Sequence, residues 1–250
     1  MAGHSQFKNI MHRKKAVDAR RSRAFSKHAR LIMTAARTGG PDPATNLSLR
    51  YAIDRARDDN MTNDAIERAV RKGAGEGGGQ AMEALTYEGY GPGGVAILIE
   101  ALTDNRNRTF SEVRQVVEHN GGSLGASGSV AWNFERRAVL LVPGLPEREE
   151  AVLEAALTAE ADDCAPTEGG FEVTADPGRF SQVRAALAAA GLRPEKSEIA
   201  WVPRTTVRLA DEQVAVLVAL LSGLDDLDDV QATATNLEWT DEAVAAAERA

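Results

Sequence analysis

Hydrophobic side chains recur every three or four positions through the first part of the chain. Between residues 16 and 37 they form one stripe, made of Phe25, Ala29, Ile32, Met33 and Ala36. This spacing predicts an amphipathic helix, and Gly39-Gly40-Pro41 marks its end. Two further helices with one apolar face each are predicted over 46–58 and 62–73. Such helices bury their apolar faces against one another, so a small helical bundle is expected.

The third of these helices has the most complete end signals. Thr62 can cap its first turn, and Met61 and Ile66 are placed as a hydrophobic staple. Gly73 follows two basic residues and is predicted to stop the helix. The glycine-rich stretch at 75–80 then has the composition of a flexible linker. A domain boundary is therefore predicted near residue 80.

Beyond this linker the pattern changes to the period of strands. Strands are predicted at 85–90 and 95–102, followed by a helix that a capping box opens at Thr109 and by a strand at 130–134. Near the C-terminus the pattern predicts a strand, a helix and a strand, at 206–209, 211–221 and 230–235. These last elements are too few to fold alone, so we expect them to join the unit over 81–135.

Residues 136–203 contain a complete unit of another kind. Its predicted elements follow the order strand, helix, strand, strand, helix, strand, with Asp176 capping the second helix before Pro177. This βαββαβ order is that of the ferredoxin-like fold. The expected fold class is α+β, with an N-terminal three-helix domain plus two α+β domains, one ferredoxin-like and inserted into the other. The predicted domains are 1–80, 81–135 with 204–250, and 136–203.

The net charge of −8 over 250 residues conceals a strong asymmetry. Residues 1–40 contain ten lysines and arginines and one acid, Asp18, whereas residues 76–250 carry 13 basic and 30 acidic groups. Such asymmetry indicates a polyanionic partner for the basic end. A solvated helix face is the alternative, but such a face usually mixes both signs of charge.

Closely spaced cations favour nucleic acid because each neutralised phosphate releases a condensed counterion. The predicted nucleic-acid-binding residues of the basic end are Lys8, His12, Arg13, Lys14, Lys15, Arg20, Arg21, Arg23, Lys27 and Arg30. Aromatic residues are rare among them, which favours contact with phosphates over stacking on bases. Because the rest of the chain is acidic, contact is expected at this one end of the molecule.

A second pair of basic residues, Arg106 and Arg108, lies in the polar stretch 103–109. Two interpretations stay open for this pair. The arginines either cover a turn and pair with nearby acids, or they form a second contact point for nucleic acid or protein.

Four acidic residues, Asp225, Asp226, Asp228 and Asp229, stand close together near the C-terminus. A magnesium site is one interpretation of such a run. The spaced Gly and Glu partners of a cation-binding loop are absent, however. A solvated acidic connector between a helix and a strand is therefore favoured.

Other candidate chemistry is weak. The glycine-rich stretch at 89–94 matches G-x-G-x-x-G, but β-type residues follow it where the dinucleotide fingerprint needs a helix, so a tight hairpin is predicted. The four histidines have neither metal-ligand spacing nor a paired nucleophile, and Cys164 reads as a small core residue. We therefore expect no catalytic residues, no metal, no cofactor, no small-molecule substrate and no enzymatic activity.

The expected location is the cytoplasm. Cys164 stands alone, so no intrachain disulfide is possible, which is typical of reducing compartments. No apolar run reaches 18 residues, and the charged N-terminus lacks the apolar core of a secretory signal. No contact with a membrane is expected.

Several longer motifs along the chain resemble those of the YebC family. They are Met1-Ala2-Gly3-His4-Ser5, His12-Arg13-Lys14-Lys15, Phe25-Ser26-Lys27, Tyr87-Glu88-Gly89-Tyr90-Gly91-Pro92-Gly93-Gly94, Asp104-Asn105-Arg106-Asn107-Arg108-Thr109, Gly128-Ser129-Val130-Ala131 and Asp228-Asp229-Val230-Gln231. Together they span nearly the whole chain and are highly specific as a set.

The resemblance implies a helical N-terminal domain followed by two α+β domains, and a regulatory protein that is not an enzyme. Bacterial YebC-type proteins are usually designated DNA-binding transcriptional regulators. The mitochondrial relative is a translational activator of cytochrome c oxidase, and the family has been linked to ribosomes and difficult peptide-bond formation. The expected partner is thus nucleic acid, either DNA or ribosomal RNA, with the ribosome as a further candidate. A protein that binds branched DNA is another alternative.

Overall fold

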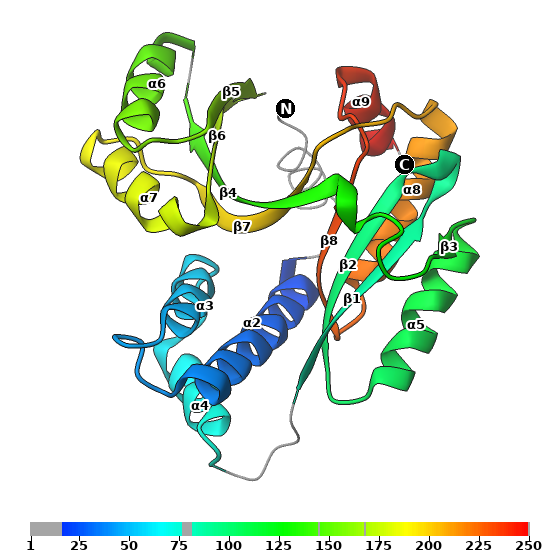
Figure 1. The fold of residues 1–250 in the computed structure, drawn as a ribbon, viewed down its shortest axis with the longest axis horizontal. Helices are drawn as coiled ribbons and strands as arrows, with labels where there is room; N and C mark the ends of the chain where they lie inside the picture. The colour runs from blue at the N-terminus through cyan, green and yellow to red at the C-terminus, as the bar shows by residue number, and fades with distance from the viewer. Residues whose placement is uncertain (1–16, 77–81, 145, 168, 250) are drawn as a thin grey trace.

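The chain folds as α+β, with a helical region at the N-terminal side and two four-stranded sheets (Figure 1). This computed structural model describes residues 17–76, 82–144, 146–167 and 169–249. The fold class predicted from the sequence is confirmed. The limits of the three domains stay a prediction.

The helical region consists of α2 (Val17–Gly39), α3 (Leu47–Asp58) and α4 (Asn63–Gly73). The first of these helices packs against the other two around a shared apolar core that includes Ile32, Leu49 and Ile66. Thr62 caps α4 as predicted, because its side chain accepts a hydrogen bond from the backbone N–H of Ala65 at 3.4 Å. The three helices predicted from the apolar pattern therefore share one core, as expected.

Gly73 has a different role from the predicted one. It is the last residue of α4, and its backbone does not adopt the left-handed conformation of a glycine stop. A Cβ atom at this position would lie 2.4 Å from the carbonyl oxygen of Met33 in α2. The helix ends at Gly73 as predicted, but the glycine is not a left-handed stop; it allows the backbones of α4 and α2 to approach closely.

The first sheet has the strand order β3-β1-β2-β8. Its strands are β1 (Glu83–Tyr90), β2 (Ala96–Thr103), β3 (Ser123–Leu124) and β8 (Val230–Thr235). One face packs against the helices α5 (Arg106–His119) and α8 (Asp211–Asp225), and α9 (Asp241–Arg249) packs against α8 in the same apolar core. The opposite face packs Leu98 against Phe134 and Trp201, at the side of the second sheet.

The hairpin predicted at 89–94 is confirmed. Strands β1 and β2 pair antiparallel from Glu83 opposite Thr103 to Tyr90 opposite Ala96. The short 3-10 helix η1 (Pro92–Gly94) makes the turn between them. Gly93 and Gly94 have φ angles of 65° and 78°, a conformation that L-residues with a side chain rarely adopt.

The predicted start of α5 was wrong. The helix begins at Arg106, because the side chain of Asn105 accepts a hydrogen bond from the backbone N–H of Arg108 at 3.1 Å. Thr109 is therefore not a cap; it lies in the first turns of the helix and is completely buried. Asn105 is extended before the helix, which is the usual backbone of a capping residue.

Two short strands predicted beside this sheet are also absent from the described structure. The stretch at 206–209 makes only an isolated bridge between Val207 and Leu237. The stretch at 130–134 forms the 3-10 turn η2 (Ala131–Asn133) and then enters β4 (Phe134–Pro143). Helix α9 was not predicted; the last predicted element was the strand at 230–235.

The second sheet has the strand order β5-β6-β4-β7, all neighbours antiparallel. Besides β4 it contains β5 (Asp163–Thr167), β6 (Gly170–Ala175) and β7 (Lys196–Pro203). Helices α6 (Glu149–Thr158) and α7 (Phe180–Ala189) pack on it. The 3-10 turn η3 (Pro146–Arg148) precedes α6, and the 3-10 turn η4 (Pro177–Arg179) precedes α7. This is the predicted ferredoxin-like order, and in the chain it lies between strands β3 and β8 of the first sheet.

None of the helices in the described part of the chain combines the length and the apolar character needed to cross a membrane.

Candidate nucleic-acid interface

The predicted basic residues divide into those that the structure describes and those that it does not. Lys8, His12, Arg13, Lys14 and Lys15 lie outside the described residues. Arg20 and Arg21 belong to the beginning of α2, but the description of side chains starts beyond them. The geometry of the interface therefore begins at Arg23.

Three predicted residues lie on one face of α2, at positions 23, 27 and 30, and they contact the acidic run 225–229. Arg23 forms an ion pair with Asp226. The ammonium of Lys27 lies 2.8 Å from a carboxylate oxygen of Asp225 and 2.9 Å from its backbone carbonyl. A helix brings residues three and four apart to the same side, which explains why one short loop reaches all three cations.

Arg30 makes the deepest contact of the three. It pairs with the carboxylate of Asp229 and donates a hydrogen bond to the carbonyl oxygen of Asp228 at 2.9 Å. The exposed fractions of the Lys27 and Arg30 side chains are only 14% and 20%. Helix α2 lies beside strand β8 of the first sheet, which starts directly after this loop (Figure 1). The cations of α2 thus dock the helical region onto the first sheet.

The prediction of a solvated acidic connector was wrong for Asp229. Only 3% of this residue is exposed. Its carboxylate lies 2.6 Å from Nη2 of Arg108, 2.7 Å from the hydroxyl of Thr109 and 3.1 Å from that of Thr103, in addition to its contact with Arg30. A buried carboxylate needs partners of this kind, because removing an ion from water is costly unless its charge and lone pairs are satisfied.

These contacts change the acidity of Asp229. Burial by itself would raise the pKa of the carboxyl. Hydrogen bonds from Arg108, Thr109, Arg30 and Thr103 outweigh that effect and lower the pKa from 3.8 to about 2. Asp229 is therefore ionised throughout the physiological range, and the same contacts raise the pKa of Arg108.

The two loop arginines, Arg106 and Arg108, lie in different surroundings. Arg108 pairs with Asp104 at 2.9 Å as well as with Asp229, as expected if it covers a turn next to acids. The side chain of Arg106 is 69% exposed, and its contact with Glu83 is long, at 3.7 Å. The structure thus commits Arg108 to an internal contact and places Arg106 at the surface.

A second contact joins the helical region to the other sheet. The hydroxyl of Tyr51 in α3 accepts a hydrogen bond from the backbone N–H of Ile199 in β7 at 2.7 Å, and the Tyr51 ring packs edge-on against Phe180. Arg55 lies 3.4 Å from Glu198 and faces the Tyr51 ring. Burial raises the pKa of Tyr51. The helical region therefore contacts both sheets through polar groups.

Five exposed cations on α3 and α4 were not among the predicted residues. They are Arg50, Arg57, Arg68, Arg71 and Lys72. Residues 41–75 carry no net charge, and that balance concealed the basic side chains. The helical period could have revealed them, because a helical projection of 46–58 and 62–73 places these cations away from the apolar face.

The chemistry of a metal site is absent from the described residues, where no group of three histidine, cysteine or acidic side chains could hold an ion. Cys164 is a half-buried free thiol, and burial raises its pKa. A thiol with a raised pKa is a poor nucleophile at neutral pH.

Comparison with known proteins identifies the family. Residues 5–76 match the TACO1/YebC protein N-terminal domain, and residues 82–237 match the TACO1/YebC second and third domain. The chain belongs to the TACO1/YebC family. This membership confirms the resemblance found in the sequence motifs.

Individual relatives of the TACO1/YebC family align over nearly the full chain. A probable transcriptional regulatory protein of Acidothermus cellulolyticus is 47% identical over 98% of this chain and 99% of its own length. One from Caldanaerobacter subterraneus is 44% identical over 97% and 100%. The crystal structure of a conserved hypothetical protein from Aquifex aeolicus has a TM-score of 0.81 and 45% identity, covering 89% of this chain and 92% of that chain.

Proposed function

We propose that this protein is a non-enzymatic nucleic-acid-binding regulator of the YebC type, acting in the cytoplasm on DNA as a transcriptional regulator. The names of its relatives, probable transcriptional regulatory proteins, support a regulatory role and a nucleic-acid partner. The proposal assigns the phosphate contacts to the basic N-terminal end, including Lys8, His12, Arg13, Lys14, Lys15, Arg20 and Arg21.

The observation that carries the proposal is the row of cations on α2 and its present partners. Arg23, Lys27 and Arg30 bind a row of carboxylates in the loop 225–229. Carboxylates and phosphates accept the same charge-assisted hydrogen bonds from arginine and lysine. The face of α2 is therefore chemically suited to a phosphate backbone, and the acidic loop holds it when no nucleic acid is bound.

The distribution of charge gives the proposed complex an orientation. Residues 76–250 contain 30 acidic and 13 basic groups, so most of the protein repels a polyanion. Residues 8–21 would make the first phosphate contacts, and Arg23 and Lys27 would follow only if Asp225 and Asp226 release them. Arg106 is exposed on the first sheet side and is a secondary candidate, whereas Arg108 is held by Asp229.

A salt titration of the full chain tests this proposal. Affinity for duplex DNA is measured at several salt concentrations for the native protein and for a variant with four replacements at the basic end, Lys8→Gln, Arg13→Gln, Lys14→Gln and Lys15→Gln. The slope of log K against log salt should become shallower by about 0.9 for each replaced cation that contacts a phosphate.

A matched control removes the same charge elsewhere. It carries Arg193→Gln, Arg204→Gln, Arg208→Gln and Arg249→Gln, all at exposed positions of the two sheet regions. If this control reduces the slope as much as the N-terminal variant, binding follows net charge and the proposed site is wrong.

The choice of nucleic acid is tested with the same assay. Linear duplex, a four-way DNA junction and a ribosomal RNA fragment are compared at one salt concentration. Preference for the duplex supports the transcriptional role. Preference for ribosomal RNA would instead support a ribosome-associated translation factor, and preference for the junction a branched-DNA accessory protein.

A further inference from the structure

Strand β1 has one edge that is mostly open. Strand β3 is its neighbour on that side, but the pairing covers only Gly89 and Tyr90, with one further hydrogen bond at the carbonyl oxygen of Glu88. From Glu83 to Tyr87, β1 pairs only with β2, which lies on its other side; this holds for the residues that the structure describes. An unpaired strand edge presents backbone groups that another strand can bind.

The direction of the backbone groups along this edge follows from one hydrogen bond. The carbonyl oxygen of Glu88 accepts from the backbone N–H of Gly125, on the β3 side, at 2.8 Å. In a strand the N–H and C=O of one residue point to the same side, and alternate residues share that side. The backbone groups of Thr86 and Ala84 therefore point to the open edge, and both residues are exposed.

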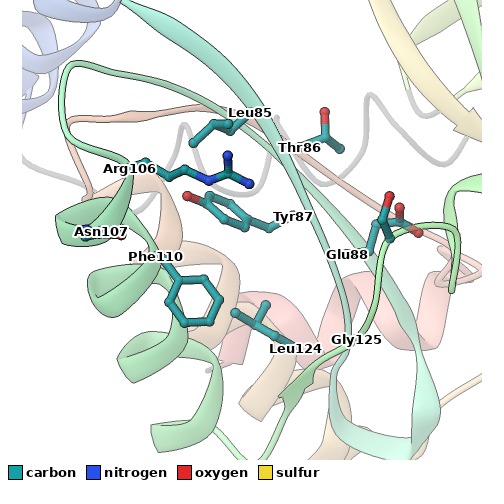
Figure 2. A pocket seen from close by; sticks show the side chains of 10 residues that line it. Leu85, Thr86, Tyr87, Glu88, Arg106, Asn107, Phe110, Leu124 and Gly125 are labelled. Carbon is teal, nitrogen blue, oxygen red and sulfur yellow. The ribbon is translucent and has the colours of Figure 1, made fainter.

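A groove runs along this edge, between β1 and the first turns of α5 (Figure 2). It has a volume of about 250 Å³. Four of its side chains are apolar or aromatic, namely Leu85, Tyr87, Phe110 and Leu124, and polar residues line the rest of it. Phe110 is 42% exposed although its ring lies 6.1 Å from that of Tyr87. The groove therefore has apolar side chains along one side and the unpaired backbone groups of β1 along the other.

The charged groups of the groove differ in their availability. Glu88 is buried, and its carboxylate accepts three backbone hydrogen bonds, from Gly128, Val130 and Ala131 at 2.6–2.8 Å. Arg106 lies at the opposite end, next to Tyr87 in the view of Figure 2, and its side chain is largely exposed. The groove therefore offers one accessible cation, and an incoming acidic group would complement it.

We propose that this edge binds an extended peptide segment of a partner protein, which adds a strand to the first sheet between β1 and α5. The peptide continues the line of β3, antiparallel to β1, and exchanges backbone hydrogen bonds with Thr86 and Ala84. Alternate side chains of the peptide face Phe110 and Leu124 and are apolar. An acidic residue near its C-terminal end meets Arg106, because an antiparallel peptide ends beside the start of β1.

A free strand edge favours a peptide over nucleic acid. Edge pairing needs a partner with alternating N–H and C=O groups at the spacing of a β-strand, which only a peptide backbone repeats along its length. This inference does not depend on the proposed function, because the groove contains none of the residues of the basic N-terminal end and shares with the proposed interface only the secondary candidate Arg106.

The probe for the test is a fluorescent heptapeptide that alternates threonine and valine and ends in glutamate. Its binding to the full chain is measured by anisotropy, together with two forms that are N-methylated at one or the other alternate set of residues. N-methylation of the set that faces β1 should weaken binding by about tenfold or more, while methylation of the other set leaves it within about twofold.

Protein variants give a second readout. Thr86→Pro removes an N–H that has no partner in the described structure, and an edge strand tolerates proline at such a position. It should weaken peptide binding by about tenfold. Phe110→Ala should also weaken it, whereas Leu157→Ala, which changes an exposed apolar residue of α6 on the other sheet, should not.

Three results would overturn the inference. The first is equal affinity for both N-methylated peptides, which would mean that no strand pairing occurs. The second is displacement of the peptide by a single-stranded oligothymidylate, which would make the groove a nucleic-acid site. The third is a dimer of the chain that Thr86→Pro dissociates in sedimentation, which would make a second copy the occupant.

Discussion

Nη2 of Arg108 lies 2.6 Å from the carboxylate of Asp229, so α5 binds from within the first sheet region the same acid that Arg30 of α2 binds from outside. Thr103, at the end of β2, completes this arrangement at 3.1 Å. One buried carboxylate therefore joins the helical region to two elements of the first sheet region. Four donors around one acid explain why the contact persists despite the cost of burying a charge.

Replacement of Asp229 by asparagine should destabilise the protein by about 2 kcal/mol, because Arg30 and Arg108 would lose the charge that compensates their partial burial. The asparagine side chain has nearly the same size, so the loss reports charge and hydrogen bonding rather than packing. Urea denaturation of Asp229→Asn and the native protein measures the difference in unfolding free energy.

The matched control is Asp211→Asn, which breaks an ion pair with Arg249 between two exposed side chains. This change should alter the unfolding free energy by less than about 0.5 kcal/mol. Equal losses for the two variants would contradict the central role of Asp229.

The stability supplied by Asp229 should depend on pH in a defined direction. The pKa of this carboxyl is lowered in the folded protein, from 3.8 to about 2. Its contribution is therefore fully present above pH 3.8 and is lost as the pH falls through about 2. The shift corresponds to about 2 kcal/mol.

The measurement compares the native protein with Asp229→Asn over the same pH range. Other carboxylates titrate in both proteins, so the difference between their unfolding free energies isolates Asp229. That difference should be constant from about pH 7 to about pH 5 and shrink as the pH approaches about 2. A difference that grows on acidification would show that the pKa of Asp229 is raised instead.

The role of Asp229 could not be predicted from its local sequence. Its neighbours Asp225, Asp226 and Asp228 are exposed, and the run as a whole has the composition of a solvated loop. The partners of Asp229 come from α2, β2 and α5, which lie more than a hundred positions away. Only the paired strands β2 and β8 bring them together, and strand pairing across an inserted unit is not a local property of the chain.

Elements with strong periodicity were predictable because their signals are local. The apolar stripe of α2 and the cap at Thr62 each depend on residues within a few positions. The predicted start of α5 was wrong because two residues, Asn105 and Thr109, both have side chains suited to capping a helix. Thr109 instead contacts the buried Asp229, so a tertiary contact decided between two local signals.

Removal of the acidic partners of α2 should strengthen nucleic-acid binding if the proposed interface is correct. The double variant Asp225→Asn with Asp226→Asn releases Arg23 and Lys27 from their ion pairs. The salt slope for duplex DNA should then become steeper by up to about 0.9 for each of the two cations. The anchoring pair of Arg30 and Asp229 stays intact in this variant.

A control must remove the same negative charge from another surface. Asp211→Asn with Glu212→Gln does so at the start of α8, where both acids are exposed. This control weakens the general repulsion of a polyanion but releases no cation of α2. If it steepens the slope as much as the loop variant, the loop does not mask the interface.

Substitution of Gly73 by alanine tests the close contact between α4 and α2 by the sign of its effect. In an open helix position alanine is more favourable than glycine by about 1 kcal/mol, so helix propensity alone predicts a more stable protein. The added Cβ would lie 2.4 Å from the carbonyl oxygen of Met33 and 2.8 Å from its Cα, and backbone atoms cannot move aside alone. We expect Gly73→Ala to destabilise the protein by about 2 kcal/mol, as overpacking does in a core. Urea denaturation decides the sign of the change in unfolding free energy.

The comparison is Gly40→Ala. Gly40 has open space around it and a φ of 88°, so its replacement should cost only about 1 kcal/mol of backbone strain. A stabilised Gly73→Ala variant would mean that the two helices can separate without loss, and that the glycine is not required for their packing.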